Sequence, residues 1–154
     1  MRTRPAVPGD LPRIIEVSLA AFETVTWQRT VDRTFGPLQG LDWRERWRRR
    51  MEKAFQEETF LVLEENQQIL GYACGTVDTA IGLGHIDILA VDPAARGRGC
   101  GRHLLSTMEE LFRSQGATHV TLESLVDNET ANSLYRRTGY QQLAQHINWF
   151  KKLG

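Results

Sequence analysis

Apolar residues recur along this chain with two different periods, which predict a mixture of helices and strands. In the first part, apolar side chains three and four residues apart predict helices over residues 11–22, with Asp10 as N-cap, and 43–55. A short strand over residues 3–7 precedes them, and Pro5 places it at a sheet edge. Residues 23–41 show poor periodicity and contain Gly36-Pro37 and Gly40, so we expect loops there.

Shorter apolar and β-branched runs, typical of strands, follow in the middle of the chain. Residues 59–64 and 68–78, with a turn at 65–67, predict a β-hairpin. Residues 86–91 are almost continuously apolar between Gly84 and Asp92-Pro93, which indicates a buried strand. The helical period then returns around residues 104–112, and Gly116 is a good C-terminal stop.

The remaining sequence predicts a strand, a helix and two more strands. The strand covers residues 119–125, and the helix is capped by Asn128 or Asp127 and ends at Thr138-Gly139. Residues 140–143 and 146–151 are the last two predicted strands. We therefore expect one domain, residues 1–154, with a mixed α/β fold: a mostly antiparallel sheet of about seven strands with helices on both faces.

Composition narrows the class of protein without identifying it. The chain has 154 residues, is 41% hydrophobic and 25% charged, and its 19 basic and 19 acidic residues cancel. Nothing in this balance indicates attraction to nucleic acid or anionic lipid. We expect no membrane span, because no apolar run approaches ~18 residues, and no signal peptide. The two cysteines, Cys74 and Cys100, do not suggest a disulfide framework, so we expect a reducing cytoplasm.

A glycine-rich segment, residues 96–101, joins the buried strand to the next helix. Such a loop aims backbone N–H groups and a helix N-terminus at one point, which suits a phosphate, and glycine permits close approach. Arg96, Arg98 and Arg102 add positive charge. There is no Gly-Lys-Ser/Thr, and the glycine spacing does not fit a dinucleotide fingerprint. A turn without any ligand is the alternative interpretation.

Two blocks in this region resemble a known family. Arg96-x-x-Gly99-x-Gly101 resembles the acetyl-CoA signature of the GNAT superfamily of N-acetyltransferases. Residues 128–140 resemble its Asn-x-x-Ala-x-x-Leu-Tyr-x-x-x-Gly-Phe pattern, with Tyr140 in place of Phe. The resemblance extends from about residue 59 to the C-terminus. It implies the GNAT fold, in which the strands before the two blocks splay apart and hold CoA, while residues 23–41 would cover the acceptor site.

The resemblance also implies a reaction and a set of binding residues. It implies acetyl-CoA as cosubstrate, no metal, and direct transfer of the acetyl group to a primary amine. The loop amides would hold the pyrophosphate and the first splayed strand the pantetheine arm. By position, the cofactor-binding residues are Leu89, Ala90, Val91, Arg96, Gly97, Arg98, Gly99, Cys100, Gly101, Arg102, Asn128, Asn132 and Tyr135.

The catalytic assignment is partly open. Tyr135 matches the family's tyrosine beside the CoA sulfur, which makes it the expected general acid. A lysine-like amine with pKa ~10.4 is mostly protonated at neutral pH, so a base or a desolvating pocket is needed. Glu123 is the first candidate base, because the sequence here resembles the ribosomal-protein N-terminal acetyltransferase branch. His85 and Asp87, on one face of the signature strand, are the rivals.

Three further expectations accompany this assignment. A non-catalytic acyl-CoA-binding regulatory protein on the same fold is the alternative function.

The basic run from Arg44 to Arg50 would suit nucleic acid, but the interspersed Glu45 and Glu52 favour a solvated helix face. The apolar stretch 146–150 near the sheet end suggests pairing as a homodimer. The sequence does not identify the amine acceptor, which could be a small molecule or a protein.

Overall fold

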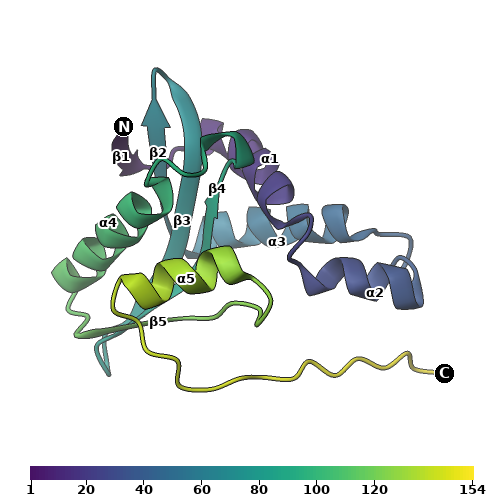
Figure 1. Ribbon diagram of the computed structural model, residues 1–154. Helices are drawn as coiled ribbons and strands as arrows, with labels where there is room; N and C mark the ends of the chain where they lie inside the picture. Colours follow the sequence, from purple (N-terminus) through teal and green to yellow (C-terminus); the bar gives the residue numbers. More distant parts are fainter.

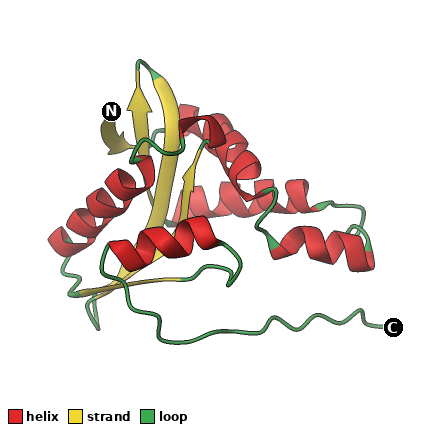
Figure 2. Ribbon diagram, in the orientation of Figure 1, coloured by secondary structure: helices red, strands yellow, loops and turns green.

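The computed structural model describes residues 1–154, which form a five-stranded sheet with helices on both faces (Figures 1 and 2). In chain order the elements are β1 (Arg2–Pro5), α1 (Leu11–Phe22), α2 (Trp27–Phe35), α3 (Trp43–Glu57), β2 (Thr59–Glu65), β3 (Gln68–Asp78), β4 (Leu83–Val91), α4 (Cys100–Ser114), β5 (His119–Leu122) and α5 (Glu129–Arg137). Single 3₁₀ turns, Pro8–Asp10 and Pro93–Ala95, precede α1 and follow β4.

The strands follow the order β1-β2-β3-β4-β5, and the first three pairs, β1–β2, β2–β3 and β3–β4, are antiparallel. β5 is parallel to β4, but the two strands pair only from Leu83↔His119 to Ile86↔Leu122. β4 continues to Val91 without β5 beside it. The predicted mixed, mostly antiparallel sheet is therefore confirmed, and its two parallel strands part after Ile86.

A β-bulge interrupts the β3–β4 ladder close to this point. Cys74 pairs with Ile88 and Gly75 with Ile86, so Asp87 has no residue opposite it. Ile86 therefore belongs to the apolar cluster under α4, while Ile88 belongs to the cluster under α1 and α3. A Cβ at Gly75 would lie 2.1 Å from the carbonyl oxygen of His85, so only glycine fits there.

The two faces of the sheet carry separate hydrophobic cores. α1 and α3 cover one face, and α4 covers the other (Figure 1). The first core contains a buried polar group, the Ser18 hydroxyl, which lies 2.6 Å from the Tyr72 hydroxyl and accepts a 2.6 Å hydrogen bond from the Trp47 indole. Because all three groups are buried, this network joins α1, α3 and β3 within the apolar core.

One prediction for the N-terminal part was wrong, and another was confirmed only in position. Residues 27–35, expected in a loop, form α2, which Thr26 caps by accepting a hydrogen bond from Gln28 N–H. Trp27, Val31 and Phe35 stand four residues apart and form an apolar stripe that indicates a helix, a signal that the breakers at Gly36-Pro37 and Gly40 obscured. Asp10 occupies the N-cap position of α1, as predicted, but its carboxylate accepts hydrogen bonds from Arg4 and from Val7 N–H and none from the helix.

The prediction of about seven strands was also wrong, because the last two strands do not form. β5 ends at Leu122, and residues 141–154 have no regular secondary structure and are exposed. Their alternating apolar pattern is that of a strand, but no sheet edge lies against them in the structure.

Both cysteines are free and buried. No helix has the length and apolarity that crossing a membrane requires.

Candidate functional site

The glycine-rich loop lies exposed between the end of β4 and the start of α4. Gly97 and Gly99 have φ of 77° and 80°, the left-handed conformation that favours glycine, and Gly99 is the N-cap of α4. A Cβ at either position would meet nothing within 4 Å. The glycines are therefore needed for the backbone conformation, and they leave open space in front of the helix N-terminus.

The charges around the loop suit an anion. The first turn of α4 contains no acidic residue, so nothing on the helix opposes the positive end of its dipole. Arg102 is exposed in that turn. Arg98 pairs with Glu65, and Arg96 Nη2 lies 3.4 Å from the Ala21 carbonyl oxygen. The loop thus fits a pyrophosphate group through its free amides and helix N-terminus.

Other residues of the two predicted motifs have structural tasks. Cys100 is buried, with its Sγ 3.4 Å from the Ala95 carbonyl oxygen. Of the two predicted caps, Asn128 is the one that caps α5, accepting a 3.3 Å hydrogen bond from Ala131 N–H. Asn132 donates to the carbonyl oxygens of Leu125 and Val126 at 3.0 and 3.2 Å. Asn132 therefore holds the loop before α5, and any contact with a cofactor would be additional.

Tyr135 lies on α5 against the core under α4. Its ring packs beside that of Tyr140, with centroids 5.8 Å apart. Burial raises the pKa of Tyr135 to about 12, so the hydroxyl stays protonated at neutral pH. No hydrogen bond engages this hydroxyl, whereas the Tyr140 hydroxyl donates to Glu109 at 2.9 Å. Tyr135 thus retains a free proton donor.

The three candidate bases all lie where β4 and β5 part. His85 pairs with Thr121 in the last part of the ladder, Asp87 follows the last paired residue of β4, and Glu123 follows that of β5. His85 Nε2 lies 3.6 Å from Glu123 Oε2. Asp87 is not part of this pair. It accepts a 2.7 Å hydrogen bond from Arg50 of α3 instead.

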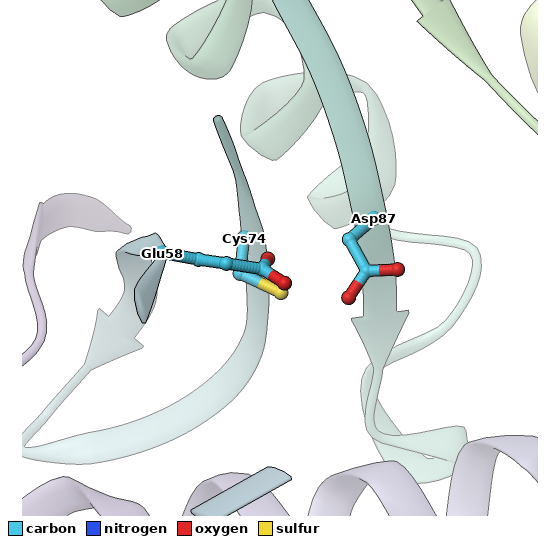
Figure 3. A group of neighbouring side chains, drawn as sticks. All are labelled: Glu58, Cys74 and Asp87. Atoms are coloured by element: carbon cyan, nitrogen blue, oxygen red, sulfur yellow. The ribbon is translucent and has the colours of Figure 1, made fainter. Parts of the chain in front are cut away.

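Asp87 also belongs to a cluster that sequence reasoning missed. Glu58, at the junction of α3 and β2, and Cys74, on β3, point toward Asp87, and their ligand atoms lie within 4.8 Å of one another (Figure 3). Glu58 Oε2 is buried without a hydrogen-bond partner. Burial and the neighbouring carboxylate of Asp87 raise the pKa of Glu58 to about 7. Burial also raises the pKa of the Cys74 thiol.

This cluster can exchange a proton near neutral pH. The carboxyl group of Glu58, with a pKa of about 7, can take up or release a proton near neutral pH. Two carboxylates and a thiol are also a donor set that a divalent metal could use. However, the Arg50 guanidinium already neutralises Asp87, and a second cation at this carboxylate would be repelled. The ion pair with Arg50 therefore disfavours a metal at this cluster.

The basic run on α3 is largely engaged in ion pairs. Arg44 pairs with Glu23 at 2.8 Å, and Arg46 with Asp32 at 2.6 Å. Arg48 and Arg49 both lie 3.5 Å from Glu45. Together with the pair between Arg50 and Asp87, these contacts support the interpretation of a solvated, internally neutralised helix face.

An open, mostly antiparallel sheet with a parting pair of parallel strands beside a glycine-rich helix start defines a domain of the acetyltransferase type. The sequence model of the Acetyltransferase (GNAT) family matches residues 25–140, and the chain belongs to this family. Both blocks on which the sequence resemblance rested lie in the matched region. The predicted family and fold class are thereby confirmed.

Curated relatives align with about half of the chain. An IAA acetyltransferase of Azospirillum brasilense is 35% identical over 81 residues, which cover 53% of this chain and 53% of the relative. An uncharacterized N-acetyltransferase of Methanocaldococcus jannaschii is 39% identical over 83 residues, or 53% of this chain and 52% of the relative. The chain thus spans about half the length of these relatives.

Solved structures share the fold at low sequence identity. An aminoglycoside antibiotic 6'-N-acetyltransferase of Acinetobacter haemolyticus superimposes with a TM-score of 0.71 at 16% identity, covering all of both chains. A ribosomal-protein-alanine N-acetyltransferase of Brucella melitensis gives 0.69 at 22% identity, covering 94% of this chain and 86% of that chain. These similarities concern the fold and do not select an acceptor.

Proposed function

We propose that the protein is an acetyl-CoA-dependent N-acetyltransferase that moves the acetyl group directly from CoA to a primary amine. The observation that carries this proposal is a juxtaposition. The open glycine loop at the start of α4 and the carboxyl groups of Asp87 and Glu58, of which Glu58 can exchange a proton near neutral pH, flank the parting of β4 and β5. One end of this arrangement suits a nucleotide pyrophosphate, and the other suits an amine.

Cofactor binding is assigned to the loop and to the free part of β4. The amides between Gly97 and Gly101 and the start of α4 would hold the pyrophosphate, with Arg102 adding charge. From Asp87 to Val91, β4 has no β5 neighbour, so its backbone groups on that side can bond the pantetheine arm as an added strand would.

We assign the proton acceptor to Asp87 together with Glu58. The amine nitrogen forms a bond to the acetyl carbon, the carbon–sulfur bond breaks, and the amine proton passes to this pair. A base works best when its pKa lies near the working pH, and the carboxyl group of Glu58 meets that condition. The Glu123 side chain is 70% exposed and stands beside His85 instead. It remains the alternative acceptor.

Tyr135 is assigned as the donor that protonates the departing thiolate. Its hydroxyl is protonated at neutral pH and engaged in no hydrogen bond. Backbone N–H groups at the bulge around Asp87 would stabilise the developing oxyanion, because a bulge leaves some backbone groups outside the ladder. The acceptor would approach from the side of α2 and α3, where Arg50 positions Asp87.

Release of free thiol from acetyl-CoA in the presence of a broad panel of amines tests this function. The panel should include protein N-terminal peptides, lysine peptides, polyamines, amino acids and aminoglycosides. Amine-dependent thiol release supports the proposal. Acetyl-CoA binding without turnover on any amine would favour the non-catalytic acyl-CoA-binding protein, and absence of binding would overturn both.

A further inference from the structure

Helix α2 carries its apolar side chains in one stripe, but neither hydrophobic core contains them. Trp27, Val31 and Phe35 stand four residues apart, which places them along one side of the helix. Val31 is buried, whereas Trp27 and Phe35 are 41% and 39% exposed. None of the three belongs to the cluster under α1 and α3 or to the cluster under α4. An apolar stripe that the cores leave uncovered indicates a binding surface.

The end of the chain completes a pocket over this stripe. Residues 141–154 leave α5 and run towards α2 (Figure 1). There the Phe150 ring lies 4.9 Å from the Phe35 ring. The pocket is therefore largely aromatic on both sides, with five apolar lining residues: Trp27, Val31 and Phe35 from α2, and Trp149 and Phe150 from the C-terminal segment.

The size and polarity of this pocket define the kind of group that it can hold. Its volume is about 200 Å³, and an apolar cavity of about 150 Å³ is enough to hold benzene. The other lining residues are Thr30, Thr34 and Asn148, so no charged side chain lines the pocket. A cationic group held there would lose water without gaining a counter-charge, which is unfavourable. The pocket therefore suits an uncharged, ring-sized apolar group.

α2 is fixed beside the proposed proton acceptor. Arg46 of α3 pairs with Asp32 of α2 at 2.6 Å and donates a 3.1 Å hydrogen bond to the side-chain oxygen of Gln28. One turn further along α3, Arg50 binds Asp87. Four helical residues rise by only ~6 Å, so α2 and Asp87 are held at neighbouring positions along α3. The pocket thus belongs to the side from which we expect the acceptor to approach.

We propose that this pocket binds an uncharged, ring-sized apolar part of the amine acceptor. The substrate class is then a primary amine that carries an aromatic ring, either a free arylalkylamine or a peptide with an aromatic side chain near its N-terminus. This inference rests on the proposed function and selects among the amines that the function leaves open. Polyamines and aminoglycosides, whose further amino groups are charged, gain nothing from such a pocket.

The first test compares amines that differ in the ring. The value of kcat/KM should be about 10–100-fold higher for phenethylamine than for butylamine, which is the usual gain from burying one ring. Putrescine, whose second amino group is charged, should be no better than butylamine. A pair of tripeptides that begin with phenylalanine or alanine and are otherwise identical shows whether the ring comes from a peptide instead. Equal kcat/KM within both pairs, or a preference for putrescine over the ring-bearing amines, overturns the proposal.

Variants of the pocket wall locate the ring. Trp149→Ala and Phe35→Ala should raise the KM for the preferred ring-bearing amine about tenfold or more and leave its kcat nearly unchanged, because the ring is held equally in the ground state and the transition state. The KM for butylamine should not change. Leu143→Ala is the matched control, since Leu143 lies on the same C-terminal segment, is 92% exposed and does not line the pocket. An equal increase for Leu143→Ala, or no increase for the two wall variants, would place the ring elsewhere.

Binding without chemistry separates this inference from the enzymatic function. Trp27 and Trp149 line the pocket, whereas the other two tryptophans, Trp43 and Trp47, are buried in the core. Phenethyl alcohol, which has the ring and no amine, should therefore change the tryptophan fluorescence saturably in the parent but not in Phe35→Ala, and butanol should change neither. Saturable binding without turnover of any amine would refute the enzymatic function and leave the pocket as a binding site. Turnover with neither ring preference nor saturable binding would overturn the inference about the pocket and leave the function standing.

Discussion

Arg50 of α3 donates a 2.7 Å hydrogen bond to Asp87, the bulged residue of β4 at the point where β4 and β5 part. The Arg50 guanidinium also lies over the Trp47 ring, 5.0 Å from its centroid. Trp47 is anchored in turn by its bond to Ser18. The helix that covers one core thus fixes the carboxylate that we assign as proton acceptor.

Replacing Asp87 by Asn should lower kcat/KM for amine acetylation by about 10²–10⁴-fold near neutral pH, the usual size of a lost base. The deficit should shrink as the pH rises, because more of the amine then arrives neutral. Glu123→Gln is the matched control, because the Glu123 carboxylate follows the last paired residue of β5, at the same point where β4 and β5 part. A deficit in Glu123→Gln and none in Asp87→Asn would move the base to Glu123. Pre-steady-state and steady-state rates from about pH 6 to pH 9 decide the matter.

Glu58→Gln should change how stability depends on pH. The folded-state pKa of Glu58, about 7, lies above its ordinary value of 4.5, so the folded protein binds this proton more tightly than the unfolded chain. Its contribution to stability is therefore full at low pH and is lost as the pH rises from about 4.5 to about 7. Glutamine carries no charge, so the variant should melt higher than the parent above about pH 7, with a smaller advantage near pH 5.

Glu57→Gln is the control for this effect, because Glu57 is adjacent but exposed. Thermal melts of the three proteins across the same pH range should show the pH-dependent difference only for Glu58→Gln. A constant difference at all pH values would mean that Glu58 is not protonated preferentially in the folded state.

The glycine loop and the second block could be predicted because their signals are local. A left-handed backbone at Gly97 and Gly99 requires particular residue types in consecutive positions, and the Asn128 cap does too. The cluster of Glu58, Cys74 and Asp87 could not be predicted in this way. It combines three separate segments, and only the bulge in β4 turns Asp87 toward the other two.

The two wrong predictions for secondary structure, the loop at residues 27–35 and the strands after residue 140, also have physical reasons. α2 does carry an apolar stripe, formed by Trp27, Val31 and Phe35, but the stripe is short and lies beside the breakers at Gly36-Pro37 and Gly40, so a loop was expected. The alternating pattern of residues 146–150 does predict a strand-like segment. A period of two says that one face must be buried, but it does not say which edge, or which copy of the chain, supplies the partner.

Ser18→Ala should destabilise the fold. The Ser18 oxygen accepts from Trp47 and bonds Tyr72, so its removal leaves a buried indole N–H without a partner. An unsatisfied buried group costs about 1–3 kcal/mol, and the melting temperature should fall by about 2–4 °C for each kcal/mol in a chain of this size. Ser106→Ala is the control, because Ser106 is exposed on α4. Equal melting temperatures for the two variants would contradict the structural importance of the network.

Gly99→Val should abolish acetyl-CoA binding measured by calorimetry, because its side chain would fill the open space before α4 and strain a backbone with φ of 80°. Gly36→Val is a matched control for the strain alone, since Gly36 has φ of 78° and equally open surroundings after α2. Both variants should lose similar stability. If Gly36→Val loses affinity as well, or Gly99→Val binds normally, the loop is not the pyrophosphate site.

Tyr135→Phe should lower kcat by ~10²-fold or more if its hydroxyl protonates the leaving thiolate. The affinity for acetyl-CoA should stay nearly unchanged, because one hydroxyl contributes little to holding so large a ligand. Tyr140→Phe is the matched control, since its ring packs against Tyr135 while its hydroxyl serves only Glu109. It should cost some stability and leave kcat nearly intact.

The pH profile separates this acid from the base. With a pKa of about 12, Tyr135 stays protonated throughout the assay range, so the ratio of parent to Tyr135→Phe rates should be the same at every pH. The ratio of the parent rate to the Asp87→Asn rate should fall as the pH rises. A Tyr135→Phe deficit that disappears at high pH would mean that Tyr135 acts on the amine side of the reaction, and normal turnover would remove it from the mechanism.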